Sequence, residues 1–219
     1  MDSSSSTGTS TGTSTGTSTG PAAEHGDERW HVEVSSPVGP LRVVAEGGMI
    51  VGLYHGDHSP APSQGRLGRP TTGPDTSPRE EAPAPGRVVG PVTPDRTMAV
   101  LRRAAAELAE YFAGTRRAFE VPVGMQGTSF QVGVWEALTR IPYGQRRSYR
   151  DIAEELDNPR MGRAVGAAVR ANPVSIIVPG HRVLSSAGAV LGYSAGTGIK
   201  TALLDLESGR QRGPESGRQ

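Results

Sequence analysis

The chain contains no cysteine among its 219 residues. This absence excludes disulfide bonds, metal sites built on thiolates, and any cysteine nucleophile supplied by the chain itself. No run of about 18 apolar residues is present, and the first residues lack the basic start and apolar core of a signal peptide. We therefore expect no membrane partner and a cytoplasmic protein.

Apolar residues are scarce in three parts of the chain. Residues 3–20 are only Ser, Thr and Gly, residues 56–96 hold nine of the 18 prolines, and residues 208–219 are mostly polar. Such segments cannot bury enough apolar surface to offset the entropy of ordering. The expected organisation is a disordered tail (1–29), an N-terminal domain (30–122) with a disordered insertion (56–96), a C-terminal domain (123–207) and a second disordered tail (208–219).

The N-terminal domain has the pattern of a small sheet followed by a helix. Short apolar segments at 31–34, 41–45 and 49–54 are separated by Pro and Gly, which predicts a three-stranded antiparallel meander. From residue 97 to 112, apolar residues recur at helical spacing until Gly114 ends the run.

The C-terminal domain is predicted to be mainly helical. A helix is expected over 129–138, and a capping box at Ser148 begins another that ends before Pro159. A third helix follows over 161–169, so that the two form a helix-turn-helix candidate. A short buried strand is predicted at 175–178, then a flexible loop at 192–196. The last helix, 197–207, is expected to bury these residues: Ile199, Ala202, Leu203 and Leu206. The fold class is therefore mixed α/β (α+β), with a small antiparallel sheet and a helical C-terminal domain.

Positive charge is concentrated in this second half. Residues 140–182 hold eight arginines against four acidic residues, as expected of a surface that faces a polyanion. An alternative is codon composition, because 22 of the 23 basic residues are Arg. The outward face of the helix over 161–169 carries small residues flanked by arginines: Gly162, Arg163, Gly166, Ala167 and Arg170. Small side chains allow close approach either to nucleic acid or to another helix.

A co-linear set of motifs runs through about 85 residues of the C-terminal half. In chain order the segments are 127–131 (GTSFQ), 134–135 (VW), 141–144 (IPYG), 148–149 (SY), 152–153 (IA), 163–166 (RAVG), 172–173 (NP), 179–183 (PGHRV), 192–193 (GY) and 200–207 (KTALLDLE). This set resembles the O6-alkylguanine-DNA alkyltransferases, which are suicide DNA-repair proteins. The family binds duplex DNA in the minor groove and extrudes the damaged base, since the alkyl group lies within the base stack.

The resemblance implies roles for individual residues. Gly162, Gly166 and Ala167 would lie against the DNA backbone, with Arg170 on the same face. Arg163 would fill the gap left by the extruded guanine, and Tyr149 would help to rotate its phosphate. Val178, Tyr193 and Ser194 would line the base pocket, with Ser194 offering a hydrogen bond. Asn172 would orient the loop of the active site, and His181 with Glu207 would form the thiolate.

The position of the nucleophile departs from the family. The family has a cysteine between the proline and the histidine of its signature, and this chain has Gly180 there. Displacement at an alkyl carbon needs a soft, ionised nucleophile, which glycine cannot supply. Permanent alkyl transfer to this chain is therefore excluded by the family's route.

Three interpretations of Gly180 remain open at this stage. The protein resembles alkyltransferase-like lesion sensors, although those usually carry tryptophan at this position; or it is a methyltransferase inactivated by mutation; or His181 and Glu207 activate a water in the vacated space. A helix-turn-helix transcription regulator is a further alternative, but it leaves the 179–182 motif and Glu207 unexplained. The expected partner is double-stranded DNA carrying O6-alkylguanine, with nucleotide-excision-repair proteins acting after a sensor. A monomer without cofactor or metal, associated with the nucleoid when bound to DNA, is expected.

Overall fold

The computed structural model describes residues 28–71 and 93–209. The predicted disorder of residues 1–27, 72–92 and 210–219 lies outside the described residues. None of the helices in the described ranges is long and apolar enough to cross a membrane.

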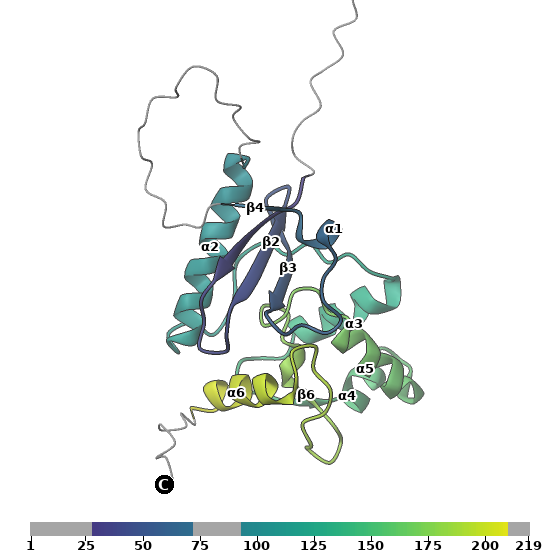
Figure 1. Cartoon of the computed structure of the whole chain (residues 1–219). Coiled ribbons are helices and arrows are strands. Elements are labelled where there is room, and N and C mark those ends of the chain that lie inside the picture. The colour runs from purple at the N-terminus through teal and green to yellow at the C-terminus, as the bar shows by residue number, and fades with distance from the viewer. Residues whose placement is uncertain (1–27, 72–92, 210–219) are drawn as a thin grey trace, which may run out of the picture.

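The N-terminal part is built on the predicted antiparallel meander. Its strands are β1 (Trp30–Val34), β2 (Leu41–Glu46) and β3 (Met49–His55), and β2 lies between the other two. The β1–β2 connection turns at Gly39, whose φ of 91° is readily adopted only by glycine. The mixed fold with a small antiparallel sheet is therefore confirmed (Figure 1).

Residues 56–71 differ from the disordered insertion predicted over 56–96. They form a short helix, α1 (Gln64–Leu67), and a two-residue strand, β4 (Arg69–Pro70), which adds to β1 in parallel. Leu67 is buried in a small cluster with Val44, Val51 and Tyr54 on the sheet. The proline count misled the prediction because Leu67 is buried on the sheet and the backbone of residues 59, 69 and 71 donates hydrogen bonds to the rest of the fold.

Helix α2 (Asp95–Phe112) lies along the sheet (Figure 1) and begins two residues before the predicted start. Its buried residues include Val100, Leu101, Ala104 and Leu108, which follow the 3.6-residue period of a helix with one buried face. Asp95 in the first turn complements the positive end of the helix dipole.

The C-terminal part is helical, as predicted. Its elements are α3 (Ser129–Thr139), β5 (Arg147–Ser148), α4 (Tyr149–Glu155), the 3₁₀ turn η2 (Pro159–Met161), α5 (Gly162–Arg170), the 3₁₀ turn η3 (Gly180–Arg182), β6 (Val183–Leu184) and α6 (Thr197–Glu207). The capping box predicted at Ser148 is formed with Asp151, and a second one starts α3 at Thr128. Gly162 is the first residue of α5 rather than an interior residue, so it carries little of the usual helix penalty of glycine.

The buried face of α6 differs from the prediction. The buried residues are Lys200, Leu203, Leu204 and Glu207, whereas Ala202 is exposed and Ile199 and Leu206 are only half-buried. The apolar pattern predicted the wrong buried face for α6, because it assumed that charged side chains lie on the solvent side of the helix. Lys200 and Glu207 are instead buried with polar partners, which removes most of the cost of burial.

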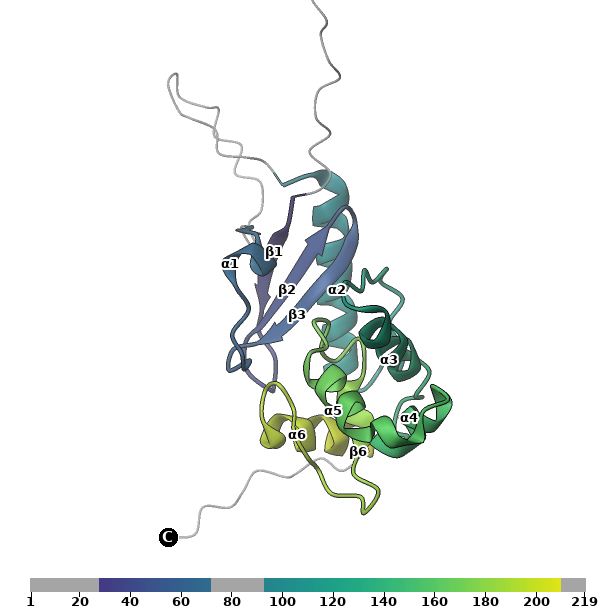
Figure 2. The same cartoon turned by 90° about the vertical axis from the view of Figure 1, so that its right-hand side faces the viewer.

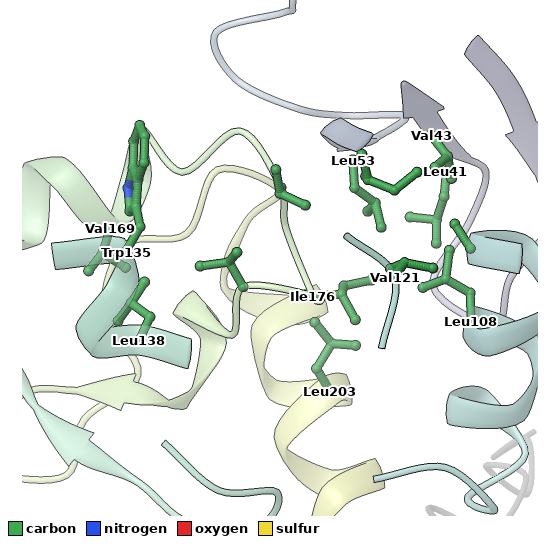
Figure 3. Packing of buried hydrophobic residues seen from close by; sticks show 14 of the residues in the cluster. Leu41, Val43, Leu53, Leu108, Val121, Trp135, Leu138, Val169, Ile176 and Leu203 are labelled. Atoms are coloured by element: carbon green, nitrogen blue, oxygen red, sulfur yellow. The ribbon is translucent and has the colours of Figure 1, made fainter. Parts of the chain in front are cut away.

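One hydrophobic core joins the two parts of the fold. Figure 3 shows Leu41, Val43 and Leu53 of the sheet on one side and Trp135, Leu138 and Val169 on the other, with Ile176 and Leu203 between them. The end of β3 also forms an isolated bridge between Leu53 and Val174. Seen from the side, α3 to α6 gather at this end of the sheet (Figure 2). The sheet therefore packs directly against the segment that carries the family signature.

Candidate functional site

The segment after α5 is a turn, in contrast to the strand predicted over 175–178. Val178 N–H donates to the Val174 carbonyl at 2.9 Å, and Ile176 has a φ of 68°, which is unfavourable for a β-branched residue. Asn172 holds this turn from inside: its Nδ2 donates to Val178 O at 2.8 Å, and its Oδ1 accepts from Val174 N at 3.0 Å. Buried apolar residues gave the signal of a strand, but the hydrogen bonds of Asn172 stabilise a turn. The position of Asn172 fits the loop-orienting role that the resemblance implies.

Gly180 follows this turn as the first residue of η3 and is buried. Its backbone lies outside the left-handed region, so other residues can adopt the same conformation. A Cβ built at Gly180 would lie 3.3 Å from Val169 Cγ1, and 3.6 Å from both Asn172 Nδ2 and Val169 O. The site therefore accepts a small side chain if the methyl group of Val169 moves by a few tenths of an ångström.

Glu207 is the centre of a buried polar cluster that includes His181, the residue that follows Gly180. One carboxylate oxygen, Oε1, lies 2.7 Å from His181 Nε2 and accepts from Tyr111 OH at 2.9 Å. Arg182 donates to Oε1 from Nη2 at 2.8 Å and to Oε2 from Nε at 2.9 Å, and Gly144 N–H donates to Oε2 at 3.1 Å. The side chains of His181 and Glu207 are 0% and 1% exposed. The carboxylate is thus fully hydrogen-bonded, as a buried charge requires.

The protonation of this cluster follows from its partners. Burial alone would raise the pKa of Glu207, but the hydrogen bonds from His181 and Arg182, together with the positive charge of Arg182, lower it to about 2. Burial lowers the pKa of His181, so its ring is neutral at pH 7. Because Glu207 accepts from Nε2–H, the proton of the neutral ring is on Nε2 and Nδ1 is unprotonated. No described residue is a partner of Nδ1, so its lone pair is left without a hydrogen bond inside the protein.

The residues assigned to a base pocket by resemblance are all buried. Val178, Tyr193 and Ser194 are 0%, 9% and 6% exposed. The Tyr193 hydroxyl hydrogen-bonds to Ser175 Oγ, and the Ser194 carbonyl accepts from Ser59 N at 2.7 Å. A residue that follows the sheet, Ser59, therefore contacts the segment that carries Tyr193 and Ser194.

The side chains of Tyr149 on α4 and Lys200 on α6 form hydrogen bonds with β6 and with the loop that follows it. Tyr149 OH donates to Leu191 O at 3.1 Å, and Lys200 Nζ donates to Val183 O at 2.6 Å and Leu191 O at 2.9 Å. Burial lowers the pKa of Lys200 to about 8. Hydrogen bonds to carbonyl oxygens thus hold this ammonium group inside the protein.

The outward face of α5 is arranged as the sequence predicted. Arg163, Ala167 and Arg170 are exposed, and the Tyr149 ring lies 3.8 Å from the Cβ position of Gly166. In the part of the chain that the structure describes, neither Arg163 nor Arg170 forms an ion pair. Three other arginines of this half are paired with acidic residues of α4: Arg140, Arg147 and Arg150. The α5 face therefore carries positive charge that is free to meet an external anion.

The inner side of α5 is fixed by packing. Trp135 on α3 is 2% exposed and its Nε1 donates to Ala168 O at 2.8 Å. Both α3 and α4 pack against α5. Of the small residues on the other face, Ala167 is exposed and Gly166 lies beside the Tyr149 ring of α4, so the packing alternative holds for Gly166 and not for Ala167.

Three residues of the site were missed from the sequence. Arg182 belongs to the 179–183 motif, and its position beside His181 was the available signal. Lys200 lies seven residues before Glu207, a spacing that puts both side chains on one face of the helix. This spacing could have indicated that Lys200 is buried on the same side as Glu207. Tyr111 gave no signal, because it lies on α2, 96 residues away from Glu207 in the chain. Among residues 28–71 and 93–209, no group of three or more His, Asp or Glu residues could hold a metal ion.

Comparison with known proteins agrees with this geometry. Residues 129–209 match the family model described as 6-O-methylguanine DNA methyltransferase, DNA binding domain. A methylated-DNA–protein-cysteine methyltransferase of Mycobacterium tuberculosis is 36% identical over 177 residues, which cover 81% of this chain and 91% of the relative. The inducible enzyme of that name from Bacillus subtilis is 53% identical over 103 residues, 47% of this chain and 58% of the relative.

Solved structures show the same likeness. The crystal structure of Mycobacterium tuberculosis OGT in complex with DNA has a TM-score of 0.65 and 34% identity, covering 83% of this chain and 94% of that one. The fold and the sequence together define a member of the DNA-repair alkyltransferase class. The chain belongs to the family of methylated-DNA–protein-cysteine methyltransferases.

Proposed function

We propose that this protein is a lesion sensor, which binds O6-alkylguanine in duplex DNA and does not take up the alkyl group. One observation carries the proposal: the framework around the reactive position is complete, but Gly180 has no side chain and the chain has no cysteine. His181 and Glu207 form the arrangement of a general base, yet no thiol is present to be deprotonated.

Duplex DNA is the proposed partner, with α4 and α5 acting as a helix-turn-helix. The unpaired arginines and small residues of the α5 face support this role, since they allow both charge contact and close approach to the backbone. A relative of this fold has been crystallised in complex with DNA. Arg163 would enter the stack in place of the extruded guanine, with Gly166 and Ala167 against the backbone.

Base extrusion would bring the alkylated guanine between Val178, Tyr193 and Ser194. These side chains are shielded from water, so an extruded base would be stacked and hydrogen-bonded rather than solvated. Binding without transfer would leave the lesion in place. A sensor of this kind would act as a monomer and mark the lesion for nucleotide-excision-repair proteins.

A methyltransferase inactivated at one position is the second candidate. The space at Gly180 favours it, because a Cβ meets only one contact as close as 3.3 Å, and that contact is a methyl group. The relatives are named as methyltransferases, and they share 36% identity over 81% of this chain. Under this proposal, natural selection would no longer maintain the affinity of the pocket for alkylated guanine.

Equilibrium binding to matched duplexes tests the two candidates. Fluorescent duplexes of one sequence, with and without a single O6-methylguanine, are titrated with the protein at two salt concentrations. A sensor is expected to bind the modified duplex at least about tenfold more tightly, since every stacked and hydrogen-bonded contact in the pocket depends on the flipped base. Equal affinities for the two duplexes would contradict the sensor, and dependence on the surrounding sequence alone would indicate a transcription regulator.

A further inference from the structure

A chain of buried hydrogen bonds connects the sheet to the wall of the base pocket. His55, the last residue of β3, has its Nε2 3.1 Å from Ser175 Oγ, which in turn hydrogen-bonds to the Tyr193 hydroxyl. The three residues are 3%, 2% and 9% exposed. The rings of His55 and Tyr193 also meet edge to face, with centroids 5.8 Å apart.

The direction of the first hydrogen bond follows from the state of His55. Burial, with His58 and His181 nearby, lowers the pKa of His55 to about 4, so the ring is neutral at pH 7. Its Nδ1 is buried and has no partner among the described residues. A buried N–H without an acceptor is rarer and more costly than an unpaired lone pair. The proton is therefore on Nε2, and His55 donates to Ser175.

The backbone of β3 also hydrogen-bonds to the turn that contains Ser175. Leu53 N–H donates to Pro173 O at 2.8 Å, and Ser175 N–H donates to Leu53 O at 3.2 Å. The turn contains Ile176 in the left-handed region, a conformation that persists only where the surroundings enforce it. Strand β3 thus fixes the turn through its backbone and, through His55, the hydroxyl group of Tyr193.

We propose that His55 is a positioning residue for lesion recognition, acting through Ser175 on the ring of Tyr193. The hydroxyl of Tyr193 is at the far end of the ring, so anchoring it fixes the direction of the side chain against which an extruded base would stack. The inference rests on the proposed function, because it assigns Tyr193 to the base pocket. It makes the selectivity for alkylated guanine dependent on a residue of the N-terminal sheet.

Two variants of His55 separate the hydrogen bond from the volume of the ring. His55→Leu removes the donor, and His55→Gln keeps an N–H at about the reach of Nε2. The ratio of affinities for the O6-methylguanine duplex and the unmodified duplex is measured for each variant. We expect His55→Leu and Ser175→Ala to lower this ratio about fivefold to tenfold, with the affinity for the unmodified duplex unchanged, because α5 binds the backbone of both duplexes. His55→Gln should recover most of the ratio.

A matched control removes a buried side chain from the same sheet. Val44 is 0% exposed and packs in the small cluster with Leu67, away from the pocket. Val44→Ala should lower thermal stability and leave the ratio of affinities unchanged. A duplex with 2-aminopurine beside the lesion gives a second readout, since its fluorescence rises when the neighbouring base is extruded, and this rise should be smaller with His55→Leu.

Each outcome decides the inference. If the wild-type protein discriminates between the duplexes and His55→Leu discriminates equally well, the positioning role is wrong while the proposed function stands. If both affinities of His55→Leu fall in parallel and His55→Gln restores neither, His55 has only a structural role. If the wild-type protein itself does not discriminate, the proposed function and this inference are both overturned.

Discussion

Replacing Glu207 with Gln tests the buried cluster at the centre of the site. The variant keeps the size of the side chain and removes its charge. The carboxylate accepts hydrogen bonds from Tyr111, His181, Arg182 and the Gly144 amide, and its side chain is 1% exposed. Loss of the charge leaves the Arg182 guanidinium buried without a counter-ion.

Two order-of-magnitude arguments about the same ion pair give the size of the effect. Lowering the pKa of Glu207 from 4.5 to about 2 corresponds to about 3 kcal/mol of stabilisation at neutral pH. Removing one partner of a buried ion pair typically costs about 3–5 kcal/mol. We therefore expect Glu207→Gln to lower the free energy of unfolding at pH 7 by about 3 kcal/mol. For a domain of this size the loss corresponds to about 6–12 °C in Tm.

Urea unfolding at several pH values provides the assay. Since the pKa of Glu207 is lowered in the folded state, its contribution is fully present above pH 4.5 and is lost as the pH falls toward about 2. The wild-type protein should lose this contribution over that interval, and Glu207→Gln should lack that part of the loss. Burial lowers the pKa of His181, which adds a separate loss in both proteins below its ordinary value of 6.5.

Arg182→Met is the matched control for the ion pair. The single variant should also be strongly destabilised, because it leaves Glu207 buried without its main donor. The double variant Glu207→Gln/Arg182→Met should be less destabilised than the sum of the two single variants. A loss below about 1 kcal/mol for Glu207→Gln at pH 7, or additive effects in the double variant, would refute the reasoning.

Three other substitutions have defined expectations. Gly180→Cys should change the free energy of unfolding by less than about 1 kcal/mol in urea melts, since the added Cβ requires only the Val169 methyl group to move; a loss of several kcal/mol would mean that the site does not accept the sulfur atom beyond the Cβ. Arg163→Ala should weaken binding to the O6-methylguanine duplex in fluorescence titrations more than to the unmodified one, because its proposed place is the gap left by the base; an equal loss for both would assign it to phosphate contact alone. Tyr111→Phe should cost about 1 kcal/mol in the same melts by removing one hydrogen bond to Glu207, and no change in stability would contradict the contribution assigned to this bond.

Local patterns were sufficient for most of the helices and for the sheet. Helix α6 begins and ends where its spacing predicted, and Ser148 caps α4 as its sequence indicated. Both features depend on residues within a few positions of one another. The rotation of α6 could not be predicted this way, because Lys200 and Glu207 are buried by partners that lie far away in the chain.

The turn at 175–178 shows the same limit at the site itself. Its apolar residues predicted a strand, but the side chain of Asn172 and the end of β3 stabilise a turn with Ile176 in a rare conformation. The resemblance of motifs placed His181, Asn172 and Glu207 in one site without information about their contacts. The support given by Tyr111 and His55 depends on how the sheet packs against the helices, and no local pattern contains it.

Intact-mass measurement after incubation with an O6-methylguanine duplex tests the central claim most directly. The wild-type protein should retain its original mass, and the duplex its methyl group, under conditions in which the protein binds that duplex in preference to the unmodified one. Gly180→Cys, measured in parallel, should gain the mass of one methyl group, which would show that His181 and Glu207 still support transfer. Addition of a methyl group to the wild-type protein, or loss of the methyl group from the duplex in its presence, would contradict the account.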